Sequence, residues 1–360
     1  MCMTGSNDKQ RVRESKPKEL TADEIYHRVL VPAKKLNTVA VVWSGGEFLV
    51  RRDAIELLRM ATDLGMRSNV CSNCKKLTRK VLERIRDATD GRGTIAVGIN
   101  ALDDSNRETR DAEVDRTLEV LELCKELGLS RHVIITLGKF NTDSFDNTVQ
   151  YLVDNDISYN RSPFVPRGSG HGCWEAGRFT REDLQDHFHP VLRKHVNGYV
   201  SYTPYFLAPE VHARISGGAR SNTVPRNPSI GCWCGHWLTV NAEGDVSVCP
   251  VLVDSLSAGN VRDAHLDQLV NNRELFASIT DRSRLKGKCG RCRYQFTCGG
   301  CRAMAFYHDG DYMGEDPTCF FEPIDKTTVS EFEEETNRRF KQYTLIAACS
   351  GLYRRPDRKR

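Results

Sequence analysis

Hydrophobic positions along the first two-thirds of the chain follow two alternating periodicities. Thr38–Trp43 is a short apolar run rich in β-branched residues, which is typical of a buried parallel strand. The unit then repeats, and we expect four further strands at Arg67–Cys71, Thr94–Ile99, His132–Leu137 and Ile157–Arg161. Four segments between them have helical spacing: Arg51–Leu64, Leu77–Ala88, Ala112–Leu127 and Ser144–Asn155. Strict β–α alternation predicts an α/β fold whose parallel sheet curls towards a barrel, with functional groups at the carboxyl ends of the strands.

Capping residues mark the ends of several predicted helices. A further helix, Thr21–Leu36, precedes the first strand, and Thr21 with Glu24 three positions later has the pattern of a capping box. Gly65 and Gly128 each follow the last turn of a helix, where glycine readily takes the left-handed conformation that ends it.

The last third of the chain differs in composition, which indicates a second domain. We expect a partial barrel over residues 1–215, a linker over 216–229 rich in Gly, Ser, Asn and Pro, and a cysteine-rich module over 230–323. Residues 324–360 then supply a last helix, Thr327–Ala348, and a basic tail. A chain of 360 residues is long enough to form two such cores.

Composition excludes several classes of protein. The net charge of +4 is too small over this length to indicate a nucleic acid or an anionic membrane as partner. The chain shows no signal-peptide pattern and no run near the ~18 apolar residues of a spanning helix, so we expect a soluble cytoplasmic protein. Fourteen cysteines in such a chain favour metal binding over disulfides.

Seven cysteines near the C-terminus have the spacing of cluster ligands. They follow C-x9-G-x4-C, then C-x2-C-x5-C-x2-C, then a single cysteine: Cys234, Cys249, Cys289, Cys292, Cys298, Cys301 and Cys319. A [4Fe–4S] cluster takes four thiolates, so the pattern predicts two iron–sulfur clusters. The spacing alone also fits a zinc-stabilised binding module, and the clusters alone would fit an electron-transfer protein.

The order of motifs resembles the radical S-adenosylmethionine (SAM) superfamily with a C-terminal SPASM module, which carries two auxiliary clusters. Ser44-Gly45-Gly46-Glu47 ends the first strand, where that family has Gly-Gly-Glu, and Ser72-Asn73 ends the next, where it has Thr-Asn-Gly. The run Cys298-Gly299-Gly300-Cys301-Arg302 and the later Asp316-Pro317-x-Cys319 are similar to the SPASM ending. The resemblance implies a partial (β/α)6 barrel, here lacking its first strand.

The resemblance also implies a SAM site. Gly45, Gly46, Glu47 and Asn73 would bind SAM, because glycines let the backbone approach a ligand and a carboxylate pairs with the methionyl ammonium group.

Three residues depart from the family pattern. Phe48 stands where the family usually has Pro, and Gly98 and Asn100 replace a Ser and an Asp, so ribose binding must differ in detail.

Cluster ligands follow from the same resemblance. One auxiliary cluster would take Cys234, Cys249 and Cys301, and the other Cys289, Cys292, Cys298 and Cys319. Cys232 is a candidate fourth ligand of the first cluster, although we expect side-chain alternation along a regular strand to disfavour it beside Cys234.

By resemblance, the protein is an oxidoreductase that uses SAM and [4Fe–4S] clusters. SAM would be cleaved to a 5′-deoxyadenosyl radical that takes a hydrogen atom from the substrate, while the auxiliary clusters accept an electron or anchor the substrate. The implied partners are an electron donor such as flavodoxin or ferredoxin, and a substrate that is a peptide, a protein or a biosynthetic small molecule.

The sequence contains one of the three cysteines that the catalytic cluster needs. The family holds that cluster with C-x3-C-x2-C after the first strand, and Cys2 resembles the third member. One thiolate cannot hold a cubane, so we expect the two earlier cysteines and the first strand to be encoded upstream of residue 1, and the chain as printed to be inactive towards SAM. A degenerate radical site is the alternative.

Three other cysteines are weaker candidates. Cys173, in the glycine-rich loop 168–173, could donate a hydrogen atom at the barrel mouth, although a lone cysteine is more often simply buried. Cys71 and Cys74 form a C-x2-C at a strand end, and without a second pair we expect a buried thiol and a turn residue.

The cysteine spacing predicts the metal content directly. Anaerobic reconstitution of this chain should give about eight irons per chain with the visible absorption of iron–thiolate sites. Bound zinc, which does not absorb there, or an iron content near zero would contradict the two-cluster interpretation.

Overall fold

The computed structural model describes residues 18–110, 113–195, 232, 234–235, 237–271, 274–292, 295, 298–320 and 322. Its main sheet has five parallel strands in sequential order: β1 (Ala40–Trp43), β2 (Arg67–Ser72), β3 (Thr94–Gly98), β4 (Ser130–Leu137) and β5 (Ser158–Pro163). All five predicted strands and the predicted half-barrel are confirmed.

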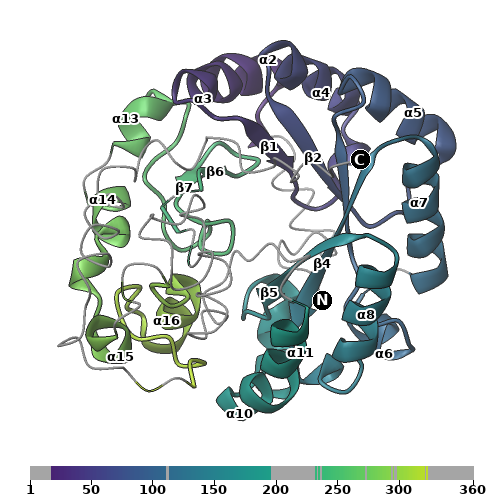
Figure 1. Ribbon diagram of the computed structural model, residues 1–360. Helices are drawn as coiled ribbons and strands as arrows, with labels where there is room; N and C mark the ends of the chain where they lie inside the picture. The colour runs from purple at the N-terminus through teal and green to yellow at the C-terminus, as the bar shows by residue number, and fades with distance from the viewer. Residues whose placement is uncertain are drawn as a thin grey trace, which may run out of the picture.

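Helices cover the outer face of this half-barrel (Figure 1). Four of them follow the first four strands: α4 (Ala54–Asp63), α5 (Arg79–Ala88), α7 (Val114–Glu126) and α8 (Phe145–Asp154). Each buries one apolar face against the strands, as Leu57, Leu58 and Ala61 do on α4. Gly65 and Gly128 have φ values of 74° and 72°, so they end α4 and α7 as predicted. The sequence did not indicate the short helix α6 (Ser105–Thr109).

The first predicted helix begins as expected but is not regular. Thr21 caps α2 (Ala22–Glu24) through the predicted capping box. A π-helical segment, Ile25–Leu30, then precedes α3 (Val31–Lys35). Pro32 lacks the N–H group that would bond one turn back, so the turn before it widens. The same order recurs where π-helical Leu184–Phe188 precedes Pro190 in α11 (His189–Lys194).

The two faces of the sheet differ in chemistry. On β4, Val133 and Ile135 are buried in the core shared with the helices and alternate with half-buried His132. The ring nitrogens of His132 lie 3.0 Å from Ser158 Oγ and 3.0 Å from Asn160 Oδ1 on β5. Burial lowers the pKa of His132. The face turned away from the helices is therefore polar and neutral at this level of the sheet.

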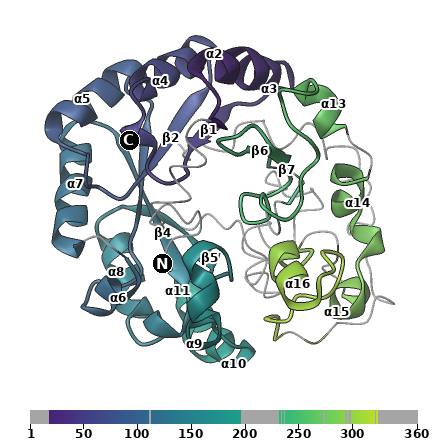
Figure 2. The same ribbon diagram turned by 180° about the vertical axis from the view of Figure 1, so that it is seen from behind.

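The cysteine-rich module lies opposite the half-barrel, so that the two together form a ring (Figures 1 and 2). Its elements are short: β6 (Thr239–Val240), β7 (Val246–Ser247), α13 (Leu266–Val270), α14 (Phe276–Thr280), α15 (Gly287–Arg291) and α16 (Arg302–Asp309). Strands β6 and β7 form an antiparallel pair.

Two sets of polar contacts hold the module to opposite ends of the half-barrel. Before β1, Arg262 donates to both carboxylate oxygens of Glu24, at 2.7 and 3.0 Å, and Arg28 donates to Val261 O at 3.1 Å. After β5, Arg167 pairs with Asp254 at 2.8 Å. The module is thus tied to both sides of the sheet rather than to one.

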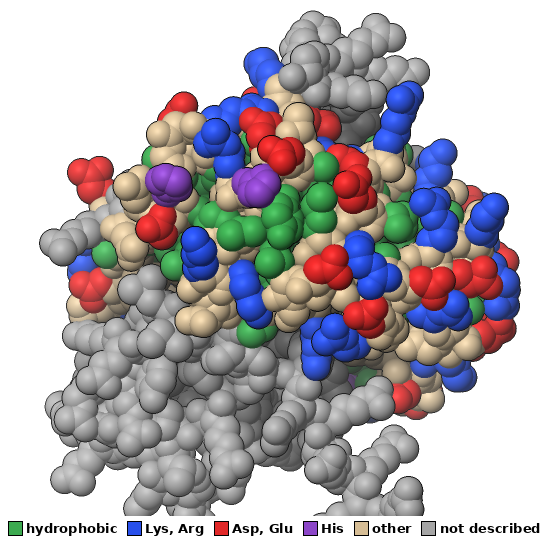
Figure 3. Space-filling view, turned by 90° about the horizontal axis from the view of Figure 1, so that it is seen from above, with side chains coloured by type: hydrophobic (Ala, Val, Ile, Leu, Met, Phe, Trp, Pro, Cys, Tyr) green, Lys and Arg blue, Asp and Glu red, His purple; other side chains and the backbone are tan. Residues whose placement is uncertain are grey.

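Surface charge is mixed on the face seen from above (Figure 3), where basic and acidic side chains surround a central group of hydrophobic ones. No helix within the described ranges is long and apolar enough to cross a membrane. The predicted linker 216–229, the last helix Thr327–Ala348 and the basic tail lie outside the described residues, so the domain boundaries stay predictions.

The Glu24–Arg262 contact predicts a pH-dependent stability term. Arg262 lowers the pKa of Glu24 from 4.5 to about 2, so this contribution is present above about pH 4.5 and is lost as the pH falls towards 2. Glu24→Gln should lower the free energy of unfolding at pH 7 by about 0.2–1 kcal/mol, the range for exposed pairs. It should also weaken the pH dependence between about 4.5 and 2, measured by denaturant unfolding.

Asp23→Asn is the matched control, because Asp23 lies in the same turn, is 84% exposed and pairs with His27 at 3.4 Å. An equal loss of unfolding free energy in both variants would mean that a charge at this helix end, and not the contact of Glu24 with Arg262, stabilises the protein.

Candidate functional site

The loop after β1 presents a carboxylate that is only half satisfied. Glu47 Oε2 accepts a hydrogen bond from the backbone N–H of Asn73 at 2.8 Å. Its other oxygen, Oε1, is buried and has no hydrogen-bond partner among the described residues. Gly45 has a φ of 133°, and a Cβ there would meet no heavy atom within 4 Å. A buried carboxylate oxygen without a hydrogen-bond partner among the described residues fits a ligand that carries a positive charge.

Aromatic packing fixes this loop where the family has proline. The ring of Phe48 stacks on Trp43 with 4.8 Å between centroids, and both residues are buried. The Trp43 indole N–H donates to Ser68 Oγ at 3.0 Å. The residue after Glu47 is therefore held by core packing instead of by a rigid ring.

The Asn73 side chain stabilises a local turn, although we expected it to bind SAM. Its Oδ1 accepts from the backbone N–H of Lys75 at 3.0 Å, which stabilises the turn after β2. Only its backbone N–H reaches Glu47. That Asn73 itself contacts SAM stays a prediction.

The sequence does not indicate the polar network at the carboxyl ends of β3 and β4. The Arg110 guanidinium donates to Asn100 Oδ1 at 3.1 Å and to Thr136 Oγ1 at 3.1 Å. Asn141 bonds the Asn100 and Thr136 carbonyls. A Cβ on Gly98 would lie 2.2 Å from Arg110 Nη1, so the absence of a side chain on Gly98 makes room for the cation.

Cys71 and Cys74 have different hydrogen-bond partners. The Cys71 thiol bonds Ser44, whereas Cys74 has a φ of 68° and its thiol bonds Thr117; both interact electrostatically with Glu47. Burial raises the pKa of Cys71 and of Cys74 to about 11, so both stay protonated.

Four thiols of the module form a first group: Cys232, Cys234, Cys249 and Cys301. Cys234 hydrogen-bonds to both Cys232 and Cys249, and the bond to Cys232 lowers the pKa of Cys232. Cys301 interacts electrostatically with Cys232 and Cys249. The Gly235 N–H donates to Val248 O at 2.9 Å, which brings Cys234 beside Cys249.

Side-chain alternation along a strand does not count against Cys232 as a cluster ligand. Residues two apart on a regular strand point to the same side, so alternation does not separate Cys232 from Cys234. Neither residue lies in a strand, since β6 begins only at Thr239. The structure places both sulfurs within one group, which supports Cys232 as a ligand.

The other four thiols form a second group: Cys289, Cys292, Cys298 and Cys319. Cys298 interacts electrostatically with the other three, and burial raises its pKa. The backbone N–H of Asp316 donates to Cys289 Sγ at 3.4 Å, and Asp316 Oδ2 accepts from the Cys301 N–H at 2.7 Å. The loop before Cys319 thereby connects the two groups.

The donor set fits iron–sulfur clusters. Each group offers four soft thiolates, the number that a [4Fe–4S] cluster takes. Within the described ranges, no three His, Cys, Asp or Glu side chains are arranged to hold a single metal ion. In a cubane each thiolate binds a different iron, so its ligands need not converge on one point.

Two predicted residues remain apart from these groups. Cys2 lies outside the described residues. Cys173 is half-buried at the end of the 3-10 turn Gly168–Cys173 that follows β5.

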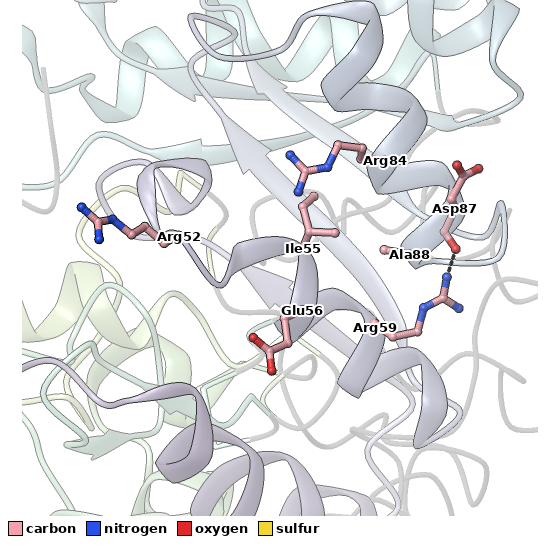
Figure 4. Close-up of a pocket in the computed structure, with 7 residues that line it drawn as sticks. All are labelled: Arg52, Ile55, Glu56, Arg59, Arg84, Asp87 and Ala88. Carbon is pink, nitrogen blue, oxygen red and sulfur yellow. Dashed lines mark hydrogen bonds between the residues drawn. The ribbon is translucent and has the colours of Figure 1, made fainter.

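A surface groove of about 480 Å³ lies on the outer face between α4 and α5 (Figure 4). Arginine and acidic side chains such as Arg52, Glu56 and Arg84 line it. None of the candidate site residues does, so the groove is separate from the site.

Two family models match this chain, one over the half-barrel and one over the cysteine-rich module. The family model for the radical SAM superfamily matches residues 1–152, and the model for an iron–sulfur cluster-binding domain (SPASM) matches residues 232–293. An AdoMet-dependent heme synthase from Methanosarcina barkeri is 29% identical over 312 residues, which is 85% of this chain and 88% of the relative. A PqqA peptide cyclase from Bradyrhizobium diazoefficiens is 25% identical over 347 residues, covering 89% and 84% of the two chains.

Solved structures share the fold. Streptococcus suis SuiB bound to S-adenosylmethionine superposes with a TM-score of 0.60 at 16% identity, covering 84% of this chain and 71% of SuiB. The enzyme anSMEcpe with bound AdoMet gives 0.61 at 14% identity, covering 91% and 88%.

The grouping of thiols predicts separable clusters. Cys319→Ala should lower the iron content from about eight to about four per chain and remove one EPR signal, because one four-thiolate set loses a ligand. Cys249→Ala should remove the other signal. Loss of both signals in each variant would mean that the module assembles as one unit or that the grouping is wrong.

Proposed function

The chain is a radical SAM enzyme with a C-terminal SPASM domain, and from this premise we propose that it removes a hydrogen atom from an organic substrate and passes the remaining electron to its auxiliary clusters. The observation that carries the proposal is the buried, unpartnered Oε1 of Glu47. Glu47 lies in the loop after β1, at the strand ends where a parallel half-barrel presents its functional groups.

Glu47 would bind the methionyl ammonium group of SAM. Its Oε2 is already fixed by the Asn73 N–H, so Oε1 is held in place before the ligand arrives and loses little entropy on binding. A charge-assisted hydrogen bond satisfies the buried oxygen and anchors the amino end of the cofactor. Gly45 and Gly46 let the backbone approach the ligand.

Arg110 would bind a carboxylate at the neighbouring strand ends. Its guanidinium is oriented by Asn100 and Thr136, at the carboxyl ends of β3 and β4. The methionyl group of SAM carries both an ammonium and a carboxylate, so Glu47 and Arg110 together offer the complementary pair of charges.

The cysteines complete the proposed cofactor sites. Cys232, Cys234, Cys249 and Cys301 would hold one auxiliary cluster, and Cys289, Cys292, Cys298 and Cys319 the other. Cys2 would be the third ligand of the catalytic cluster. When bound, the reduced catalytic cluster and SAM supply the 5′-deoxyadenosyl radical, and Cys173 is a candidate hydrogen donor near the mouth.

Two relatives suggest the substrate classes to test first. Their names, heme synthase and peptide cyclase, make a tetrapyrrole and a peptide the leading candidates for this chain. We propose flavodoxin or ferredoxin as the electron donor and the cytoplasm as the compartment.

The test is reductive cleavage of SAM, measured as release of 5′-deoxyadenosine under dithionite. It uses a chain that carries all three cysteines of the radical motif, of which Cys2 is the last. Release that rises when a tetrapyrrole or a peptide is added would support the proposal and assign the class. Redox-active clusters without SAM binding would instead indicate an electron-transfer protein.

SAM affinity should depend on the Glu47 charge. Glu47→Gln should raise the Kd for SAM about ten- to a hundredfold, because a charge-assisted hydrogen bond contributes about 1.5–3 kcal/mol and 1.4 kcal/mol is tenfold. Isothermal titration of the loaded protein measures the change.

Glu56→Gln is the matched control, because Glu56 lies on α4 and lines the outer groove instead of the site. An unchanged Kd in Glu47→Gln would remove Glu47 from the SAM site.

A further inference from the structure

Arg302 is a buried cation between the two groups of thiols. It begins α16 directly after Cys301 and is only 2% exposed. Its Nη1 donates to Tyr312 O at 2.8 Å and to Gly314 O at 2.7 Å, and its Nε to Gly300 O at 3.3 Å. These neutral carbonyls fix the side chain, and the buried carboxyl group of Asp316 lies near enough to interact with its charge.

The same residue donates a hydrogen bond to a sulfur in each group. Its Nη2 lies 3.7 Å from Cys289 Sγ, in the second group. Its backbone N–H donates to the Cys232 sulfur, in the first group. Arg302 is therefore placed between the two proposed clusters, with its charged end at the second.

The backbone around Arg302 is shaped for this approach. Gly300 has a φ of 60°, and a Cβ there would lie 2.6 Å from Arg302 Nη2 and 2.7 Å from Cys289 Sγ. Any side chain at position 300 would thus separate the guanidinium from the sulfur. The glycine is needed for the contact as well as for the turn.

A buried positive charge at a cluster ligand favours the reduced cluster. Reduction adds one negative charge to a centre already surrounded by thiolates, and the attraction is strong where water is excluded. Hydrogen bonds to the sulfurs and nearby charge are established determinants of cluster potential.

We propose that Arg302 raises the reduction potentials of the auxiliary clusters, most strongly that of the cluster held by Cys289, so that this cluster is the better electron acceptor. The inference rests on the proposed iron–sulfur function of the two thiol groups. Arg302 is a positioning residue, because it acts through the cluster ligands and does not contact the substrate.

The test is an EPR-monitored redox titration of the reconstituted protein, compared among wild type, Arg302→Lys, Arg302→Gln and Arg302→Met. In the neutral variants the Cys289 cluster should lose at least about tenfold in its reduced-to-oxidised ratio at a fixed poise, which is 59 mV for one electron. The other cluster, which keeps the backbone N–H bond, should shift less. Arg302→Lys should retain most of the wild-type potential.

Arg131→Met is the matched control, because the Arg131 side chain is only 9% exposed and also bonds one acidic and one neutral oxygen, Glu122 Oε1 at 3.1 Å and Asn155 O at 2.9 Å, at the start of β4 and outside the cysteine-rich module. Both potentials should stay at wild-type values in that variant.

Four outcomes would overturn the proposal. They are unchanged potentials in loaded Arg302→Met or Arg302→Gln, a shift in Arg302→Lys as large as in the neutral variants, a shift of that size in Arg131→Met, and failure of both neutral variants to load while Arg302→Lys loads at wild-type potentials. The last outcome would assign Arg302 to assembly. Absence of iron in the wild type would instead contradict the proposed function itself.

Discussion

A parallel half-barrel has two end strands, and the contacts that bridge them determine where the candidate site residues lie. In the described sheet these are β1 and β5. The module is tied before β1 by Glu24 and Arg262 and after β5 by Arg167 and Asp254, so it spans the open side. Arg167 also bonds the carbonyl of Pro250, next to Cys249, so one arginine fixes both the domain interface and a loop that carries a cluster ligand.

Charge is the second constraint, because eight thiolates cannot be buried together without compensation. Burial raises the pKa of Cys298, the three neighbouring thiols raise it further, and metal binding must remove that proton. The module supplies the buried cations Arg282 and Arg302, together with backbone N–H donors such as that of Asp316. Buried charges without partners are costly, so we expect the two arginines and the metal-bound thiolates to stabilise one another. Folding of the module and cluster binding should therefore be coupled.

The sequence predicts those parts of the fold that depend on local pattern. Strand order, the capping box at Thr21 and the glycine ends of α4 and α7 follow from periodicity and capping chemistry. The two thiol groups follow from spacing and resemblance. The contact between Arg302 and Cys289 could not be predicted, because it depends on a turn at Gly300 and on carbonyls ten and more residues away. The position of Cys232 does not follow from strand alternation either, because neither Cys232 nor Cys234 lies in a strand.

Departures from a family motif are informative when the structure shows what occupies the vacated space. Phe48 replaces the stiffness of a proline with stacking on Trp43, so the loop keeps its position by packing. Gly98 removes a side chain, and the Arg110 guanidinium fills that space. The first exchange preserves the local chemistry, whereas the second places a cation where a hydroxyl would stand. Asn100 also departs from the family pattern, and its Oδ1 accepts a hydrogen bond from the Arg110 guanidinium. Gly98 and Asn100 therefore form one altered unit. The ligand-binding chemistry of this chain should therefore differ from its relatives at β3 and β4 more than at β1.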